Sequence, residues 1–254
     1  MKYQKRRHIK LMMCALPILV IFLLSYCIIS VSALLGGIDI NGKADNNNAL
    51  NIADAGQQTP TNATTEGWQL LLVNSKNSLP NDFTVTLKQL KDGHSVDERC
   101  FADLNNMLSD CRAAGLQPLI CSSYRTQAKQ QQLFDDQVRK LTKQGYSSKA
   151  ATELAAQSVA TPGTSEHQTG LAVDIVDAHY QMLDALQADT ATQQWLMNNS
   201  WKYGFILRYP EDKTHITGIQ YEPWHYRYVG KEAAKEMYEQ SLCLEEYLAS
   251  KASK

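Results

Sequence analysis

The sequence predicts an α+β domain in which a small antiparallel sheet is flanked by helices. Long segments with apolar residues at helical spacing come before and between short apolar runs, rather than in strict alternation with them. That order favours an antiparallel sheet over a parallel one built from crossover helices. The chain has 254 residues and ordinary apolar and charged content, which suits one globular domain with additional segments.

The additional segments lie at the N-terminus. Residues 1–10 carry five basic and no acidic residues, and residues 11–35 carry no charge. A run of that length, at about 1.5 Å per residue, can cross a bilayer of about 30 Å. We therefore expect a cytoplasmic basic tail and a single-pass transmembrane anchor, with the rest of the chain outside the cell. The alternative is a cleaved signal peptide ending near Ala33, although its apolar region is usually only about 7 to 15 residues.

Residues 36–66 are rich in Asn, Gly, Ala and Thr and poor in large apolar side chains. Such a segment buries too little surface to order itself, so we expect a flexible stalk before a folded domain at 67–254. Without its five basic tail residues, the chain keeps 20 basic and 26 acidic residues, a balance of -6. No basic stripe remains, which argues against nucleic acid as a partner.

Within the domain, the predicted elements follow from spacing and end signals. Apolar residues at helical spacing over 96–115 end at Gly115, serines cap 147–160, and the apolar run at 171–176 is typical of a central strand. We expect extended segments at 68–74, 80–90, 116–124, 171–176, 205–210 and 216–229, and helices at 96–115, 125–145, 147–160, 190–204 and 231–249.

The cysteines outside the apolar segment are even in number: Cys100, Cys111, Cys121 and Cys243. An exported domain permits disulfides. However, Cys100 and Cys111 on one helix would lie about 16 Å apart, too far to pair. Free buried thiols are an equally good interpretation. No CxxC spacing is present, which argues against a cysteine zinc site.

Two stretches combine polar and apolar residues in a way that predicts a metal site. In SEHQTGLAVDI (165–175), His167 and Asp174 flank Gly170 at a turn from loop into strand, where the chain can double back. Imidazole and carboxylate are ordinary zinc ligands, and catalytic zinc usually has three protein ligands and a water. His225 in EPWHYRYVG (222–230) is the best candidate for the third.

Two further residues would complete a hydrolytic site. Pro223 can bend the chain so that Glu222 lies beside the metal without binding it, where a carboxylate can act as general base. Arg125, at the end of a predicted strand, can stabilise negative charge on a reacting carbonyl. Each residue also has a structural interpretation, as a surface acid, an ion-pair partner or a hydrogen-bonded histidine. A purely structural role is hardest to accept for Asp174, because a buried carboxylate is costly unless it is paired or metal-bound.

Four segments carry a resemblance to a known family: SSYRTQAKQQQLF (122–134), SEHQTGLAVDI (165–175), YGFILRYP (203–210) and ITGIQYEPWHYRYVG (216–230). Together they resemble the VanY-like D-alanyl-D-alanine carboxypeptidases. These belong to a group of zinc peptidases that also includes the D-Ala-D-Ala dipeptidases and hedgehog-type domains. The similarity runs from about residue 70 to residue 229.

The resemblance implies a zinc site in a central cleft, with His167, Asp174 and His225 as ligands and Glu222 as catalytic base. Arg125 matches the arginine that polarises the scissile carbonyl. The residues that it places near the substrate are Ser123, Tyr124, Gln130, Ser165 and Trp224. At position 123 many relatives carry glycine.

The implied activity is zinc-dependent removal of the C-terminal D-alanine from peptidoglycan stem peptides. The apolar run at residues 11–35 would hold the protein at the bacterial cytoplasmic membrane, and we expect a monomer. An L,D-carboxypeptidase, a dipeptidase or an endopeptidase acting on the same polymer is the nearest alternative. A non-catalytic wall-binding module is a further alternative, although such proteins usually lose a ligand or the base.

Overall fold

The computed structural model describes residues 67–253. The expected basic tail, transmembrane anchor or signal, and most of the expected stalk lie outside these residues. Among the residues described, none of the helices has the length and apolar character needed to span a membrane.

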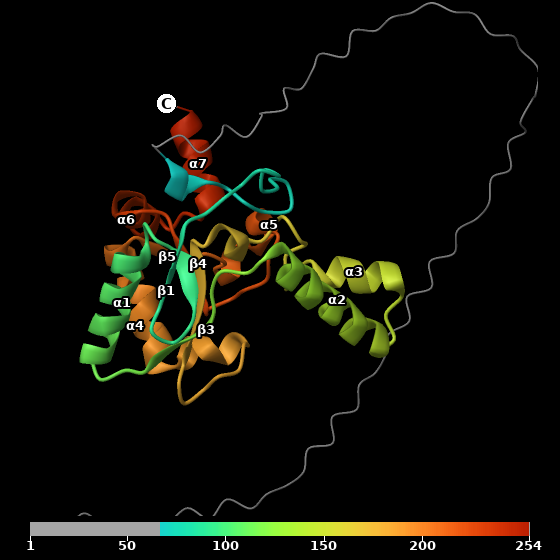
Figure 1. Cartoon of the computed structure of the whole chain (residues 1–254), viewed down its shortest axis with the longest axis horizontal. Helices are drawn as coiled ribbons and strands as arrows, with labels where there is room; N and C mark the ends of the chain where they lie inside the picture. Colours follow the sequence, from blue (N-terminus) through green and yellow to red (C-terminus); the bar gives the residue numbers. More distant parts are fainter. Residues whose placement is uncertain (1–66, 254) are drawn as a thin grey trace, which may run out of the picture. The chain divides into compact units, whose positions relative to one another are not determined.

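The described chain forms a four-stranded antiparallel sheet, a two-stranded hairpin and surrounding helices, which confirms the predicted α+β class (Figure 1). The sheet has the order β3-β4-β6-β5, and the hairpin joins β1 and β2. The strands are β1 (Leu87–Gln89), β2 (Ser95–Asp97), β3 (Pro118–Ser122), β4 (Ala172–Asp177), β5 (Phe205–Leu207) and β6 (His225–Tyr228).

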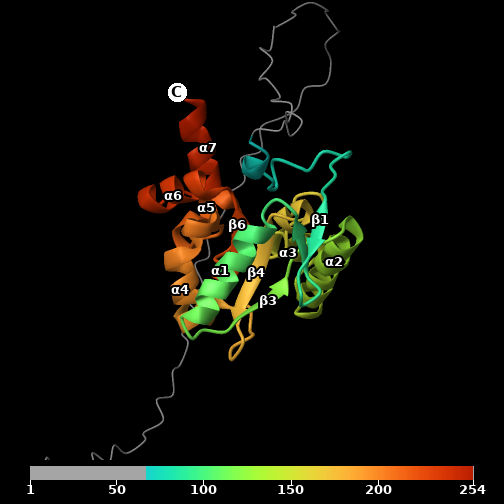
Figure 2. The same ribbon diagram turned by 60° about the vertical axis from the view of Figure 1, so that its left-hand side comes forward.

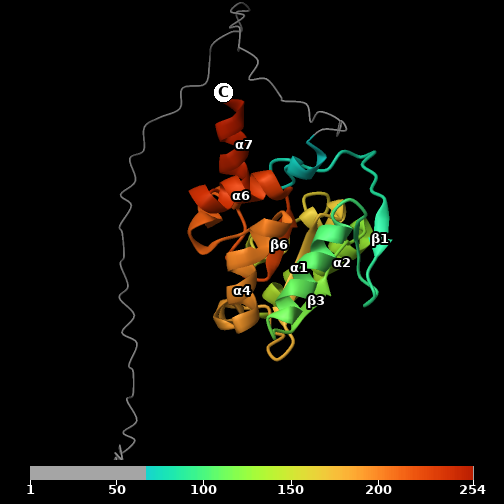
Figure 3. The same cartoon turned by 90° about the vertical axis from the view of Figure 1, so that its left-hand side faces the viewer.

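The helices lie in three groups. Helices α1 and α4 lie together against the sheet in Figures 2 and 3, α2 and α3 form a separate pair on the right in Figure 1, and α6 packs against β5. The α-helices are α1 (Phe101–Ala113), α2 (Gln127–Lys143), α3 (Ser148–Ala155), α4 (Ala191–Asn199), α5 (Thr214–Thr217), α6 (Lys231–Gln240) and α7 (Leu244–Ala252). Short 3-10 helices are η1 (Trp68–Leu70), η2 (Glu166–Thr169), η3 (Ala185–Asp189), η4 (Ser200–Tyr203) and η5 (Glu211–Lys213).

Helices α2 and α3 confirm the helices predicted at 125–145 and 147–160, and both begin at a side-chain cap. The Thr126 hydroxyl accepts from the Lys129 backbone amide at 3.2 Å, and the Ser147 hydroxyl accepts from the Ala150 amide at 3.3 Å. Each cap satisfies an amide that has no partner within its helix. The apolar run at 171–176 is also confirmed as a central strand, β4, with β3 on one side and β6 on the other.

Other predicted boundaries were wrong. Helix α1 begins only at Phe101, because residues 95–97 pair with β1 as β2. The segment 68–74 forms no strand, because Arg227 binds the carbonyl oxygens of Gln69 and Leu71 that a ladder would use. In 80–90 only residues 87–89 form a strand.

Three C-terminal predictions also need correction. Segment 216–229 is extended only from His225, because α5 occupies its start and ends at Gly218, whose φ is 77°. The helix at 190–204 divides into α4 and η4 before Gly204. The closing helix divides into α6 and α7 at Ser241, a non-glycine residue with a φ of 54°. The four cysteines of the described chain are free thiols.

Candidate metal centre and active site

Asp174 and His225 face the same side of the sheet because β4 and β6 hold them in direct antiparallel register. Successive side chains of a strand point to opposite faces. Their neighbours Val173, Ile175 and Tyr226 pack into the main apolar core with residues of α1 and α4. The two candidate ligands therefore point away from that core.

His167 reaches the same point from η2, the short helix before β4. Gly170 ends η2 with a φ of 75°, a left-handed conformation that glycine adopts without strain. A Cβ atom at this position would lie 2.8 Å from the backbone nitrogen of Asp97. Glycine at 170 thus lets the loop turn tightly against β2 and bring His167 over β4.

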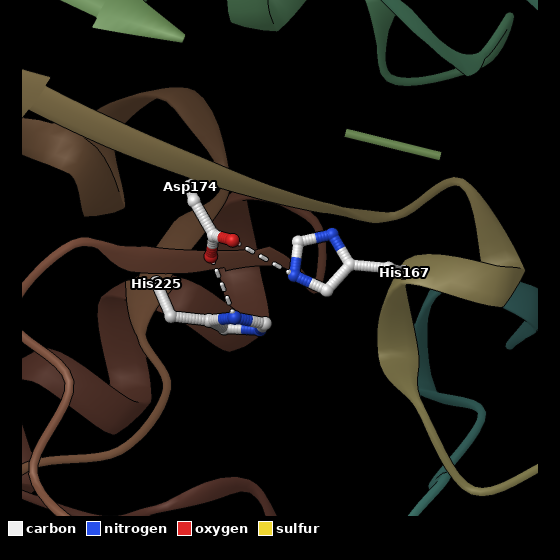
Figure 4. A group of neighbouring side chains, drawn as sticks. All are labelled: His167, Asp174 and His225. Carbon is white, nitrogen blue, oxygen red and sulfur yellow. Dashed lines mark ion pairs between the residues drawn. The ribbon is translucent and has the colours of Figure 1, made fainter. Parts of the chain in front are cut away.

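The three side chains converge as the spacing predicted (Figure 4). One ligand atom from each of His167, Asp174 and His225 lies within 4.8 Å of the others, and all three residues are buried. His167 Nε2 is 3.2 Å from Asp174 Oδ2, and His225 Nδ1 is 3.0 Å from Asp174 Oδ1. Two nitrogens and one carboxylate oxygen form a donor set suited to zinc, with room for a fourth ligand from solvent or substrate.

The hydrogen bonds of these side chains also fit a cation. Asp174 Oδ1 is the buried side-chain polar atom within residues 67–253 that makes no hydrogen bond, because its 3.0 Å contact with His225 Nδ1 lacks the geometry of one. His167 Nδ1 bonds to the carbonyl oxygen of Ser123 at 2.8 Å. A carbonyl can only accept, so the proton is on Nδ1, and Nε2 presents a lone pair to the site.

The electrostatics of the metal-free site separate the two histidines. Burial, together with the charge of Arg125, lowers the pKa of His167 to about 4. Burial alone would lower the pKa of His225 too, but its contacts with Asp174 and Glu166 raise that pKa to about 9. Burial would raise the pKa of Asp174, whereas the two histidines hold it well below its usual range. Asp174 is therefore a charged acceptor for a cation.

Arg125 lies beside the candidate ligands. Its Nη2 donates to Asp174 Oδ2 at 2.8 Å, and its Nε donates to the Ser122 hydroxyl at 2.9 Å. Nη1 is 3.4 Å from Gln130 Oε1. These contacts fix the guanidinium at the cleft wall. The Arg125 side chain is 18% exposed to solvent there.

Glu222 lies next to the cluster without belonging to it. A turn closes here, because the His225 amide donates to the Glu222 carbonyl at 3.1 Å, with Pro223 at a position that favours such turns. Glu222 Oε2 is 3.8 Å from His225 Nδ1, too far for a hydrogen bond. Burial raises the pKa of Glu222 to about 8. The turn at Pro223 agrees with the bend predicted from the sequence. Glu222 also lies beside the candidate ligands but outside their set, as predicted.

These residues open into a cleft of about 570 Å³ between the sheet and α2. Of the residues that the family resemblance places near substrate, Ser165 and Trp224 line this cleft beside Arg125 and Glu222. Arg125 also borders a second cavity of about 760 Å³, which Tyr124 lines. Their contacts with substrate remain predictions.

Ser123 and Gln130 lie behind the cleft wall rather than along it. The Ser123 hydroxyl is 3.0 Å from His94 Nδ1 and accepts from the Ser95 amide at 3.2 Å, so the residue meets the site through its carbonyl. Gln130 is fully buried and donates to the Ala160 carbonyl at 2.6 Å. Neither side chain faces the cleft. Ser123 contacts His167, and Gln130 contacts Arg125.

Sequence reasoning missed a group of buried charges behind His225: Glu166, Arg208, Arg227 and Glu245. A signal for two of them was present, because Arg208 and Arg227 stand in the otherwise apolar runs at 205–210 and 225–229. A charged residue in a strand of a buried sheet needs a partner. Nothing in the spacing identified Glu166 or Glu245 as those partners.

Comparison with known proteins gives consistent matches. The family model "VanY: D-alanyl-D-alanine carboxypeptidase" matches residues 93–231. A D-alanyl-D-alanine carboxypeptidase of Enterococcus faecalis (strain ATCC 700802 / V583) is 44% identical over 208 residues, which cover 82% of this chain and 74% of the relative.

Two solved structures are 47% identical to this chain, each with a TM-score of 0.66. One is a variant of the vancomycin resistance D,D-pentapeptidase VanY, from the VanB-type resistance cassette, in complex with Zn(II); the match covers 71% of this chain and 99% of that one. The other is VanYB in complex with D-alanine-D-alanine, with coverages of 72% and 98%.

Proposed function

The chain belongs to the VanY family of D-alanyl-D-alanine carboxypeptidases, and on that premise we propose that it is a zinc-dependent hydrolase that removes the C-terminal D-alanine from peptidoglycan stem peptides. One observation carries the proposal. His167, Asp174 and His225 bring three ligand atoms within 4.8 Å of one another, beside the carboxylate of Glu222, which is not part of that set. Similarity to VanY structures solved with Zn(II) and with D-alanine-D-alanine supports the metal and the substrate class.

The roles of the residues follow from their positions. Zinc at this site supplies positive charge that polarises a carbonyl group and makes a water molecule more acidic. Glu222 accepts a proton from the attacking water and later donates it to the departing amine. Burial raises its pKa in the metal-free protein, and the charge of bound zinc would lower it toward the range in which a carboxylate both accepts and returns a proton near neutral pH.

Arg125 stabilises the negative charge that develops on the carbonyl oxygen of the substrate. The guanidinium is already held by Ser122, Gln130 and Asp174, so little reorganisation is needed when substrate binds. Ser165 and Trp224 are the proposed contacts along the cleft wall, with Tyr124 beside the adjoining cavity.

Incubation of the purified full-length protein with defined stem peptides, followed by mass spectrometry, tests the activity. A pentapeptide ending in D-Ala-D-Ala should give the tetrapeptide and free D-alanine. Hydrolysis of free D-Ala-D-Ala to two D-alanines, without cleavage of the pentapeptide, would instead indicate a dipeptidase. Cleavage of a tetrapeptide with one terminal D-alanine would indicate an L,D-carboxypeptidase. A zinc-loaded protein that cleaves none of these, nor cross-linked peptides, would be a binding module.

We also propose that residues 11–35 hold the protein in the cytoplasmic membrane, with the catalytic domain outside. The support is the uncharged apolar run behind a basic tail. Fractionation of cells, with N-terminal sequencing, tests this. Protein that remains in the membrane fraction with an intact N-terminus is expected. Soluble protein that begins near Leu34 would show a cleaved signal.

A further inference from the structure

A group of buried charges lies behind His225, and we name it the buried charge hub: Glu166, Arg208, Arg227 and Glu245. The side chains of the first three are fully buried, and Glu245 is 14% exposed. Two guanidinium groups face two carboxylates, so the charges of the hub balance. The hub joins parts of the chain that are distant in sequence: η2, β6, α7 and the residue that follows β5.

The hydrogen bonds of Glu166 divide between its two oxygens. Oε1 accepts from Arg208 Nε and from Arg227 Nη1, both at 2.7 Å. Oε2 is 3.4 Å from Nε2 of His225. The arginines thus occupy one oxygen, and the other is directed at a nitrogen of a candidate zinc ligand.

Each arginine is held by further acceptors. Arg208 donates to both oxygens of Glu245, at 2.9 and 2.7 Å, and Arg227 donates to the carbonyls of Gln69 and Leu71, at 3.1 and 2.7 Å. These outer partners lie outside residues 93–231, which the family model matches. The position of the Glu166 carboxylate is therefore fixed from several directions before any ligand binds.

We propose that Glu166 is a positioning residue for the zinc ligand His225. Oε2 accepts the Nε2 proton of His225, so Nδ1, which lies beside Asp174 and the metal site, is the nitrogen that gives up its proton and binds zinc. An acceptor on the distal nitrogen fixes both the tautomer and the orientation of a ligand imidazole, and it makes the other nitrogen a better ligand. The inference rests on the zinc site of the proposed function.

Each of the two histidines uses one ring nitrogen for a protein hydrogen bond and offers the other to the metal site, but the nitrogens are exchanged between them. His167 bonds through Nδ1 to the Ser123 carbonyl and offers Nε2 to the site. His225 bonds through Nε2 to Glu166 and offers Nδ1. Because Glu166 precedes His167 in the chain, a single short helix both supplies one ligand and positions the other.

The test compares Glu166→Gln with Glu245→Gln in the full-length protein. Both variants remove one carboxylate from Arg208, and only the first removes the charged acceptor from His225. Zinc affinity is measured by competition with a chelator, and the unfolding temperature by calorimetry of the metal-free protein. We expect Glu166→Gln to weaken zinc binding about 10- to 100-fold. Glu245→Gln should lower the unfolding temperature but leave zinc affinity close to that of the wild type.

Equal zinc affinity in Glu166→Gln and the wild type would overturn the inference, and so would an equal loss in both variants. If Glu166→Gln does not fold, Glu166→Met combined with Arg227→Gln removes the acceptor while keeping the hub in charge balance. The same loss of zinc affinity is expected of this pair, and wild-type affinity would again contradict the proposal. Wild-type protein that binds no zinc would overturn both this inference and the proposed function.

A spectroscopic measurement separates positioning from general support of the fold. In the zinc-loaded wild type with nitrogen-15 histidine, the Nε2 proton of His225 should resonate at low field and exchange slowly with water. The signal should keep its low-field position and slow exchange in Glu245→Gln. In Glu166→Gln it should shift upfield. A fast-exchanging Nε2 proton in the wild type would show that Glu166 does not hold it.

Discussion

Two glutamates lie near His225, one on each side, and their environments differ in a way that distinguishes chemistry from support. Burial alone would raise the pKa of Glu166, but Arg208 and Arg227 hold it below the usual range. Glu222 makes no direct ion pair with an arginine, and burial outweighs the charges of His225 and Arg125 and raises its pKa to about 8. A carboxylate with its charge fully paired is a structural acceptor, whereas one with a raised pKa in a cleft can exchange protons.

The same contrast holds between the buried charge hub and the cluster of candidate zinc ligands. In the buried charge hub, the oxygens of Glu166 and Glu245 meet arginine or histidine nitrogens. On the cleft side, Asp174 Oδ1 lies 3.0 Å from His225 Nδ1 but lacks the geometry of a hydrogen bond. A buried acceptor without a hydrogen bond, next to a cleft, indicates where a ligand belongs.

The largest effect should come from removing that unused acceptor. Asp174→Ala takes one of three ligands from the metal, so zinc content should fall from about one ion per chain to near none, and turnover should be lost. Metal analysis after dialysis measures this. Asp177→Ala, on the same strand but outside the ligand set, is the control and should keep its zinc. Full zinc content in Asp174→Ala would remove Asp174 from the ligand set.

The next effect separates the base from the ligands. Glu222→Gln keeps the shape of the cleft and removes the group that accepts a proton, so kcat should fall about 10²- to 10⁴-fold. Zinc content should stay near that of the wild type, because Glu222 lies outside the ligand set. Hydrolysis rates on a pentapeptide and metal analysis of the same preparation measure both quantities. Undiminished turnover would mean that another group is the base.

The pH dependence of metal binding should follow the raised pKa of His225. A proton on Nδ1 competes with zinc, and below the pKa of about 9 that proton is present in the metal-free protein. Zinc affinity should therefore rise from pH 7 to pH 9, by about tenfold per pH unit for one released proton. Calorimetric titration in buffers of different ionisation enthalpy counts the proton. A flat profile would show that His225 is already neutral at pH 7.

The smallest effect concerns the turn between the first two ligands. Gly170 and Gly163 both have positive φ, so alanine at either position should cost about 1–2 kcal/mol. At Gly170 the added Cβ would also lie 2.8 Å from the Asp97 nitrogen, whereas at Gly163 it meets open space. Denaturant unfolding of the metal-free variants should show the larger loss for Gly170→Ala. Equal losses would mean that the loop can shift away from β2.

Local signals in the sequence predicted α2, α3 and β4, because caps and apolar runs lie within the segments that they define. The ligand set was predictable from residue type and spacing, and β4 and β6 then brought the two segments together. The break at Ser241 was not predictable, because a left-handed non-glycine residue leaves no mark in composition. Neither was the hub, because Glu166 and Arg208 are 42 positions apart and only the folded sheet brings them together.

The side chains of Ser123 and Gln130 show a related limit. The family resemblance gave their positions along the chain, and these positions do lie next to the site. Which way each side chain points depends on neighbours such as His94 and Ala160, which belong to other segments. Motif similarity therefore located these positions near the site, whereas the direction of each side chain depends on contacts with distant segments.

The direct pairing of Asp174 with His225 has a consequence for folding. If β4 slipped by one position along β6, Asp174 would turn to the opposite face and the donor set would be split. Only the correctly aligned strands can hold the ion, and an ion that binds the native form alone stabilises it in proportion to the logarithm of its concentration. Zinc would thus give its full stabilisation only to chains in which the two central strands, β4 and β6, are paired in the native register.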